Sequence, residues 1–194
     1  MINNFKTATF NNSTVNFSSN TNESVVSEPI KDSNDNLVYH ICLDKIFCSI
    51  DSDIFKKLNI ATKKIICDNR DKYLVTMNDL KNIKYLHISS HANLDSIVVG
   101  REELTIDDLL KSFDGKQLDI LFLSNCESFH IANSLKGVAK IIISTLNSIE
   151  NKDIVLINEL FWNGIIIEKI DIETIELIIK ITQKEIYNNI LIIK

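Results

Sequence analysis

The sequence has little of what interrupts regular structure: one proline and four glycines among 194 residues. Collagen-like and Gly/Ser-linker architectures are therefore excluded, and we expect mostly helices and strands. No apolar run reaches the 18 residues that a membrane-spanning helix needs, and residues 1–10 lack the basic and apolar segments of an export signal. We therefore expect a cytoplasmic chain with one folded domain, long enough to bury a full core.

Basic clusters are also missing, and the net charge is −5. Such a chain has no cluster of positive charge with which to bind nucleic acid, so neither nucleic acid nor a membrane is expected as a partner. The patterns G-x-G-x-x-G and G-x-x-x-x-G-K-[ST] do not occur. A doubly wound domain that binds a small molecule therefore remains an alternative without support from a phosphate-binding motif.

None of the four cysteines forms a C-x-x-C pair, which argues against a zinc ribbon or a thioredoxin-like site. With no export signal, we expect reduced thiols. Cys42, Cys48 and Cys67 are interpreted as small buried side chains, whereas Cys126 is a candidate nucleophile. No metal and no cofactor is expected.

The first 36 residues are polar, turn-forming and poor in large apolar groups. Because such a stretch buries too little surface to offset its ordering entropy, residues 1–36 are predicted to form a flexible arm that is dispensable for folding. Residues 37–194 are predicted to form the folded domain.

Within that domain, short apolar runs alternate with segments of helical spacing. The expected strands are 37–43, 64–67, 83–89, 96–100, 118–123, 139–144 and 190–193. The expected helices are 52–58, 77–80, 105–113, 128–135, 152–162 and 172–187, with Thr105 as an N-cap. Buried strands separated by helices indicate an α/β fold with a mainly parallel central sheet and helices on both faces.

Ligands of such sheets bind beyond the carboxyl ends of the strands. His91 directly follows one predicted strand, in the segment 89–93, and Cys126 follows another, in the segment 124–128. A single crossover would make these strands neighbours. An imidazole beside a thiol is the pair that a cysteine nucleophile needs, because the imidazole accepts the thiol proton and later protonates the leaving amine.

Both segments resemble motifs of the CHAT proteases, caspase-like cysteine peptidases related to separase. Tyr85–Ala92 resembles the family's "hydrophobic strand, then His-Gly" segment, and Leu121–Ser128 resembles its "Leu-Ser-x-Cys-Glu-Ser/Thr" segment. Other pieces follow in the family's order, so that the resemblance covers roughly residues 80–185. These pieces are Gly100 with Leu104–Leu110, Ile131–Ile142, Glu159–Gly164 and Ile175–Ile181.

The resemblance implies a caspase-like three-layer α/β fold and a cysteine endopeptidase acting on a protein or peptide, activated by a partner or by oligomerisation. His91 would be the general base and acid, and Cys126 the nucleophile. The backbone amides of Ala92 and Cys126 would form the oxyanion hole. The family has Gly where this chain has Ala92, whose methyl group restricts φ. This departure favours the alternative of a weak or inactive caspase-like module that acts as a binding subunit.

The other histidines near His91 and Cys126 are interpreted as structural residues. His87 is expected to pack in the sheet and His130 to lie on a helix surface. A metal set of His87, His91, Cys126 and His130 fits no compact zinc spacing.

Other neighbours are interpreted in the same way. Glu127 and Ser128 are expected to cap the following helix. Phe161 and Trp162 are expected in the core or at a partner contact. Asp95 and Asp119 are either an acidic pocket for a basic side chain or solvated loop acids, and the substrate-binding residues are left unassigned.

Overall fold

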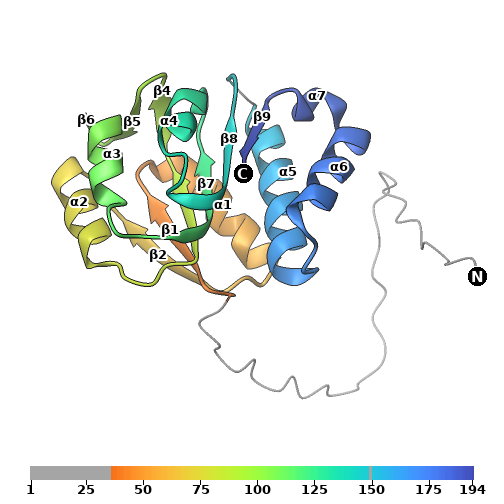
Figure 1. Ribbon diagram of the computed structural model, residues 1–194, viewed down its shortest axis with the longest axis horizontal. Coiled ribbons are helices and arrows are strands. Elements are labelled where there is room, and N and C mark those ends of the chain that lie inside the picture. Colours follow the sequence, from red (N-terminus) through yellow and green to blue (C-terminus); the bar gives the residue numbers. More distant parts are fainter. Residues whose placement is uncertain (1–35, 149) are drawn as a thin grey trace, which may run out of the picture. The chain divides into compact units, whose positions relative to one another are not determined.

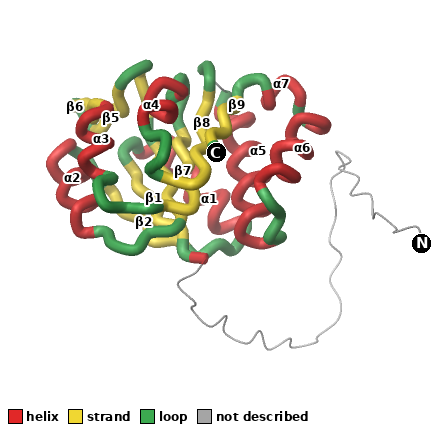
Figure 2. Tube along the Cα trace, in the orientation of Figure 1, coloured by secondary structure: helices red, strands yellow, loops and turns green. Residues whose placement is uncertain are grey.

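The computed structural model describes residues 36–148 and 150–194, which belong to one compact unit, Ser33–Lys194. The arm predicted for residues 1–36 lies outside the described residues except for Asn36. A six-stranded sheet with helices on both faces forms the described part of the chain (Figures 1 and 2). The prediction of an α/β fold with a mainly parallel central sheet is confirmed.

The central sheet has the strand order β2-β1-β3-β7-β8-β9. Five strands are parallel, and β9 pairs antiparallel with β8 at the edge. Their bounds are β1 (Val38–Cys42), β2 (Thr62–Ile66), β3 (Tyr85–Ser89), β7 (Leu118–Ser124), β8 (Ala139–Thr145) and β9 (Ile190–Ile193). The central strands are apolar nearly throughout because helices cover both faces of the sheet. Because β3 and β7 are adjacent and parallel, their carboxyl ends are neighbours.

A second, antiparallel sheet of three short strands follows β3: β4 (His91–Asn93), β5 (Ser96–Val99) and β6 (Glu102–Thr105). The sequence predicted only the middle strand. His91 is thus the first residue of a strand that starts two residues after β3 ends.

Helices α2 (Arg70–Asp79), α3 (Ile106–Ser112) and α4 (Phe129–Ser134) cover one face of the central sheet, over Leu86 and Leu121. The helices on the other face cover Phe122 and Ile120. They are α1 (Lys45–Lys57), α5 (Asn151–Trp162), α6 (Ile172–Thr182) and α7 (Lys184–Tyr187). Because side chains alternate along each strand, two separate apolar cores result, one on each face.

Two helices are longer than predicted. The α1 helix begins at Lys45 because the Asp44 carboxylate accepts the backbone amides of Ile46 and Phe47. The α2 helix begins at Arg70 because Asn69 accepts a backbone amide in its first turn. These capping side chains carry the signal that hydrophobic spacing lacks. The cap predicted at Thr105 is confirmed, with a full capping box.

The C-terminal helices also differ from the prediction. One helix expected over 172–187 is interrupted at Gln183, so that α6 and α7 are separate. The α5 helix ends at Trp162, as predicted, and Asn163 and Gly164 begin a π-helical turn, η2 (Asn163–Ile167). A Cβ atom at Gly164 would collide with Ile175 of α6, so the absence of a side chain lets the two segments approach.

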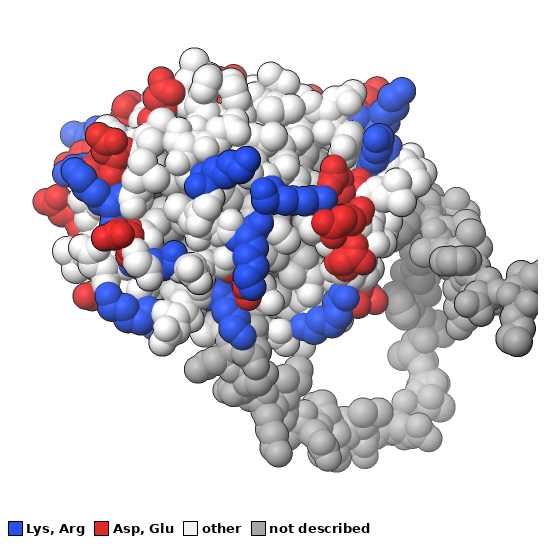
Figure 3. All heavy atoms as spheres, in the orientation of Figure 1, with Lys and Arg blue, Asp and Glu red and all other residues white. Residues whose placement is uncertain are grey.

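Acidic and basic side chains are interspersed on the face shown in Figure 3, with large uncharged areas between them. No helix within 36–148 or 150–194 is long and apolar enough to cross a bilayer.

Candidate active site

The segments that carry His91 and Cys126 lie side by side. Ser89 of β3 is the register partner of Ser124 of β7, and each candidate residue follows two positions later. The Ser90 amide donates to the Ser124 carbonyl at 3.3 Å, and the buried Asn125 Nδ2 donates to Ser90 Oγ at 3.0 Å. The two segments are therefore joined directly beyond the strand ends.

His91 lies at the rim of this edge, with 57% of its side chain exposed. Its ring packs edge-on against Phe47 of α1, with centroids 4.7 Å apart. Its Nε2 lies 3.7 Å from Asp44 Oδ2. Phe47 and Asp44, both at the start of α1, thus lie against the imidazole, and no motif in the sequence indicates this.

Cys126 lies in the loop between β7 and α4, is half-buried and takes no part in a disulfide. The loop is fixed from β8: Thr145 Oγ1 donates to the Asn125 carbonyl at 2.6 Å. The next residue, Glu127, has a φ of +52°, in the left-handed region that costs a non-glycine residue about 1–2 kcal/mol. Such local strain clusters at functional sites.

Ala92 is the middle residue of β4 and pairs with Ile97. Its methyl group packs against the core on the α2 face. Its φ lies outside the left-handed region. Alanine therefore adopts this backbone without the strain that a glycine would relieve.

The prediction that Glu127 and Ser128 cap α4 is wrong. Ser128 occupies the N-cap position, but its buried hydroxyl donates to Ser144 Oγ at 3.1 Å and makes no capping hydrogen bond. The Glu127 carboxylate accepts from Ser148 Oγ. Both side chains join the loop to the end of β8 instead.

Of the two interpretations of Asp95 and Asp119, an acidic pocket or solvated loop acids, the acidic pocket is not formed. Asp119 is the second residue of β7, at the opposite edge of the sheet, where it pairs with Lys140 at 2.6 Å. Asp95 is exposed in the turn between β4 and β5. The acid that lies near His91 is Asp44.

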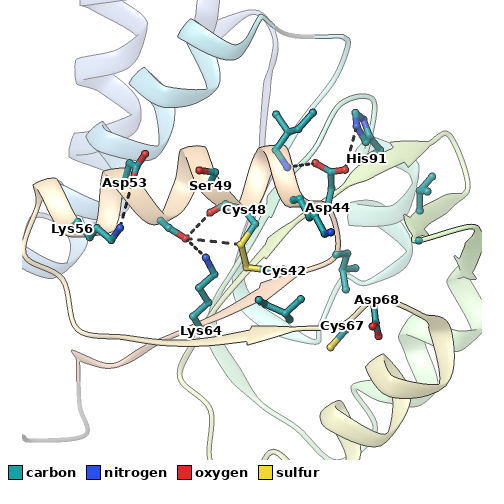
Figure 4. Close-up of a pocket in the computed structure, with 17 residues that line it drawn as sticks. Cys42, Asp44, Cys48, Ser49, Asp53, Lys56, Lys64, Cys67, Asp68 and His91 are labelled. Carbon is teal, nitrogen blue, oxygen red and sulfur yellow. Dashed lines mark hydrogen bonds and ion pairs between the residues drawn. A yellow bond between two sulfur atoms is a disulfide. The ribbon is translucent and has the colours of Figure 1, made fainter.

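A cavity of about 740 Å³ opens beside His91, between α1, the ends of β1 and β2, and β5 (Figure 4). Its lining includes Cys42, Asp44, Cys48, Lys64, Cys67 and His91. Cys126 does not line this cavity.

Cys42 and Cys48 form a disulfide, so the prediction of reduced thiols is wrong for this pair. Cys42 ends β1 with its side chain towards α1, and Cys48 lies in the first turn of that helix. Cys67 is buried, as predicted, and burial raises the pKa of its thiol.

A buried polar cluster lies beneath the ends of β3 and β7, on the α1 and α5 face. Its members are His40, Asp51, His87, Ser89, Asn158 and Trp162. Phe161, Trp162 and His87 are fully buried, and the His87 ring stacks on Phe122, which confirms the structural roles predicted for these residues. His130 is exposed on α4, also as predicted.

The hydrogen bonds of this cluster define which atoms carry its protons. Trp162 Nε1 donates to His87 Nδ1 at 3.1 Å, so the His87 proton is on Nε2, which donates to Asp51 Oδ2 at 2.8 Å. Ser89 Oγ donates to the same carboxylate. Burial opposes ionisation of Asp51, but the interactions with His87 and Ser89 outweigh it and lower its pKa.

Ser89 Oγ donates its hydrogen bond to Asp51 and accepts a hydrogen bond from His40 Nε2 at 2.6 Å. Burial lowers the pKa of His40 to about 3, so this imidazole is neutral at physiological pH. Asp51 could not be recognised from the sequence, because a lone acid within a helix carries no motif.

Two sets in the described part of the chain bring three ligand atoms within 4.8 Å of one another: His40 with Cys42 and Cys48, and His40 with Asp51 and His87. Neither set contains His91, Cys126 or His130. The disulfide occupies both sulfur atoms of the first set.

No protein-family model matches this chain, and no curated protein shows significant sequence similarity to it.

Proposed function

We propose that the protein is a cysteine endopeptidase in which His91 is the general base and acid and Cys126 is the nucleophile. The observation that carries the proposal is the register of β3 and β7, which pairs Ser89 with Ser124 and thereby sets His91 and Cys126 at equivalent positions beyond adjacent strands. The resemblance of both segments to CHAT motifs supports the same assignment.

In this mechanism His91 takes the proton of the Cys126 thiol, and the thiolate attacks the carbonyl carbon of the scissile peptide bond. The backbone amides of Ala92 and Cys126 stabilise the negative oxygen of the tetrahedral intermediate. Collapse breaks the C–N bond, and His91 gives its proton to the leaving amine. A water molecule, deprotonated by His91, then hydrolyses the thioester and regenerates the thiol.

Asp44 acts as a positioning residue, because its carboxylate lies beside the His91 imidazole while its other oxygen caps α1. The cavity beside His91 is the place for a side chain of the protein or peptide substrate. Activation by a partner or by oligomerisation, and action in the cytoplasm, belong to the same proposal.

The second candidate is a catalytically weak or inactive module that binds a partner. The observation in its favour is that the cavity reaches His91 but not Cys126. A binding site of this kind would use the cavity without needing the thiol.

A peptide library and a thiol-reactive peptide probe distinguish the two candidates. We expect wild type to cleave peptides and to be labelled at Cys126, and Cys126→Ala and His91→Ala each to lose nearly all activity while unfolding at the same denaturant concentration as wild type. Cys67→Ala is the matched control, since Cys67 is the other cysteine of residues 36–194 outside the disulfide and should be dispensable for cleavage. Full activity of Cys126→Ala would exclude the mechanism.

Ala92→Gly separates the two candidates further. For a working peptidase, kcat/KM is preserved or raised, and stability falls by about 0.4–1 kcal/mol because glycine is freer in the unfolded chain. If wild type cleaves no peptide and Ala92→Gly restores cleavage, the chain is a degenerate member of the type and the binding candidate is favoured.

A further inference from the structure

The Cys42–Cys48 disulfide is buried and forms part of the cavity wall. Both cysteines line the space of about 740 Å³, and neither belongs to the apolar clusters of the two faces. A tripeptide-sized thiol fits within a cavity of this volume. Cys42 and Cys48 are 2% and 4% exposed, and the cavity that they line is the side from which a small thiol would approach them.

A serine and a lysine lie near Cys48. Cys48 is the fourth residue of α1, where the amides of Ile46 and Phe47 donate to the Asp44 carboxylate and the Cys48 amide donates to the Asp44 carbonyl. Ser52 Oγ lies 3.9 Å from its Sγ and accepts a hydrogen bond from Lys64 Nζ at 3.0 Å (Figure 4). A lysine in the neighbourhood is one of the features that lower the pKa of a reactive thiol.

Cys42 has a different partner. His40 Nε2 lies 3.6 Å from Cys42 Sγ, and a disulfide sulfur carries no proton, so the imidazole is the donor. The same N–H donates to Ser89 Oγ, which donates to Asp51. A neutral imidazole thus already lies beside the sulfur on which negative charge would develop if the disulfide opened, with its N–H shared between that sulfur and Ser89 Oγ.

We propose that Cys42 and Cys48 form a thiol–disulfide exchange site for a small glutathione-like thiol, in which Cys48 is the sulfur attacked from the cavity and Cys42 is the leaving thiolate stabilised by His40. The site uses neither His91 nor Cys126, so it does not depend on the proposed peptidase activity.

The exchange balances with two molecules of the thiol. The thiolate of the first attacks Cys48 Sγ, a mixed disulfide forms, and the Cys42–Cys48 bond breaks with its electron pair on Cys42. A second thiolate attacks the glutathione sulfur of the mixed disulfide and releases Cys48. The protons of the two small thiols end on Cys42 and Cys48, the protein pair gains two electrons, and the two small thiols leave as their disulfide.

Reduced and oxidised glutathione, mixed at varying ratios without oxygen and followed by alkylation and peptide mass mapping, test the proposal on the native chain. We expect the wild-type disulfide to open reversibly with an unchanged circular dichroism spectrum. In oxidised glutathione, Cys42→Ser should acquire one glutathione on Cys48 at least about tenfold faster than Cys48→Ser acquires one on Cys42.

Two further variants complete the test. Cys126→Ala should leave the exchange rates unchanged, whether or not the protein is a peptidase. His40→Phe removes the N–H donor and should slow opening of the wild-type pair several-fold.

The proposal is overturned if the native disulfide opens only in unfolding concentrations of urea, or if the two single variants react equally. Should either variant fail to fold, the native wild-type experiment alone decides. Zinc chloride added to the reduced protein provides a further arm. If it prevents reoxidation at one equivalent, the pair with His40 is a metal site and the exchange proposal is wrong.

Discussion

The carboxylate of Asp44 connects the start of α1 to the imidazole of His91. Its Oδ1 accepts the amides of Ile46 and Phe47 at 2.8 and 3.0 Å, and its Oδ2 lies 3.7 Å from His91 Nε2. One side chain therefore both caps a helix and lies beside the candidate general base.

Two substitutions at Asp44 separate these roles. Asp44→Asn keeps a capping oxygen and should change stability little, whereas Asp44→Ala should cost about 1 kcal/mol. Both remove the charge beside His91 and should lower kcat by about tenfold with KM nearly unchanged. Urea unfolding and steady-state kinetics provide the measurements. Unchanged kcat in both variants would show that Asp44 acts only as a helix cap.

The buried imidazole of His40 should make the fold sensitive to mild acid. Its folded pKa is about 3, whereas an unfolded histidine titrates near 6.5. Below pH 6.5 the unfolded chain therefore binds a proton that the folded chain does not, so the free energy of unfolding decreases as the pH is lowered. We expect a loss of about 2–3 kcal/mol between pH 6.5 and 4.5.

The variant His40→Gln removes that titration, so its free energy of unfolding should fall less over the same pH interval. The comparison is of slopes, because the variant has its own stability at pH 7. Parallel curves for wild type and variant would mean that His40 is protonated in the folded state.

Gly100 lies at the turn between β5 and β6, with a φ of +63°. A Cβ atom there would overlap the backbone carbonyl oxygen of Asp68, beside the cavity. Gly100→Ala should therefore destabilise the fold by about 2 kcal/mol or more, since both strain and a backbone collision oppose it.

Gly115→Ala is the matched control, because Gly115 has a φ of +67° but no atom within 4 Å of an added Cβ. It should cost only about 1 kcal/mol. The difference between the two variants in thermal or urea unfolding measures the cost of the collision. Equal losses of stability would mean that the loop after β2, which contains Asp68, shifts to accommodate the methyl group at no cost.

Glu127, next to Cys126, tests the strained backbone of the nucleophile loop. Glu127→Gly should stay within about 1 kcal/mol of wild type and retain activity, because glycine tolerates a positive φ. Glu127→Val should lose a further 1–2 kcal/mol, about the cost of this region for a β-branched side chain, and most of the activity. Both variants lack the hydrogen bond from Ser148, so their difference reports the backbone. Equal kcat/KM in the two would show that this conformation does not position Cys126.

The central strands could be predicted because each is a short apolar run bounded by polar residues, as in Tyr85–Ser89 and Leu118–Ser124. The placement of His91 and Cys126 beyond two such strands followed from the same pattern. The start of α1 was missed because one capping carboxylate, that of Asp44, decides it.

The acids around the site could not be predicted from spacing. Asp119 is the second residue of β7 and therefore lies near the amino end of the strand, whereas the candidate site lies at the carboxyl ends. Asp51 lies on α1, 36 residues before His87, and meets it only because α1 packs across the end of β3. Sequence separation does not report which face of a sheet a helix covers.

The sequence by itself determined the α/β layering and the edge at which His91 and Cys126 lie, because hydrophobic periodicity and strand ends are local properties of the chain. Only the tertiary structure decided the partners of these residues: Asp44 beside His91, the polar cluster around Asp51, and the disulfide between Cys42 and Cys48. The physical reason is that these contacts depend on how α1 packs against β1 and β3. That packing results from burying the apolar surface of the whole domain, and no short stretch of the chain encodes it.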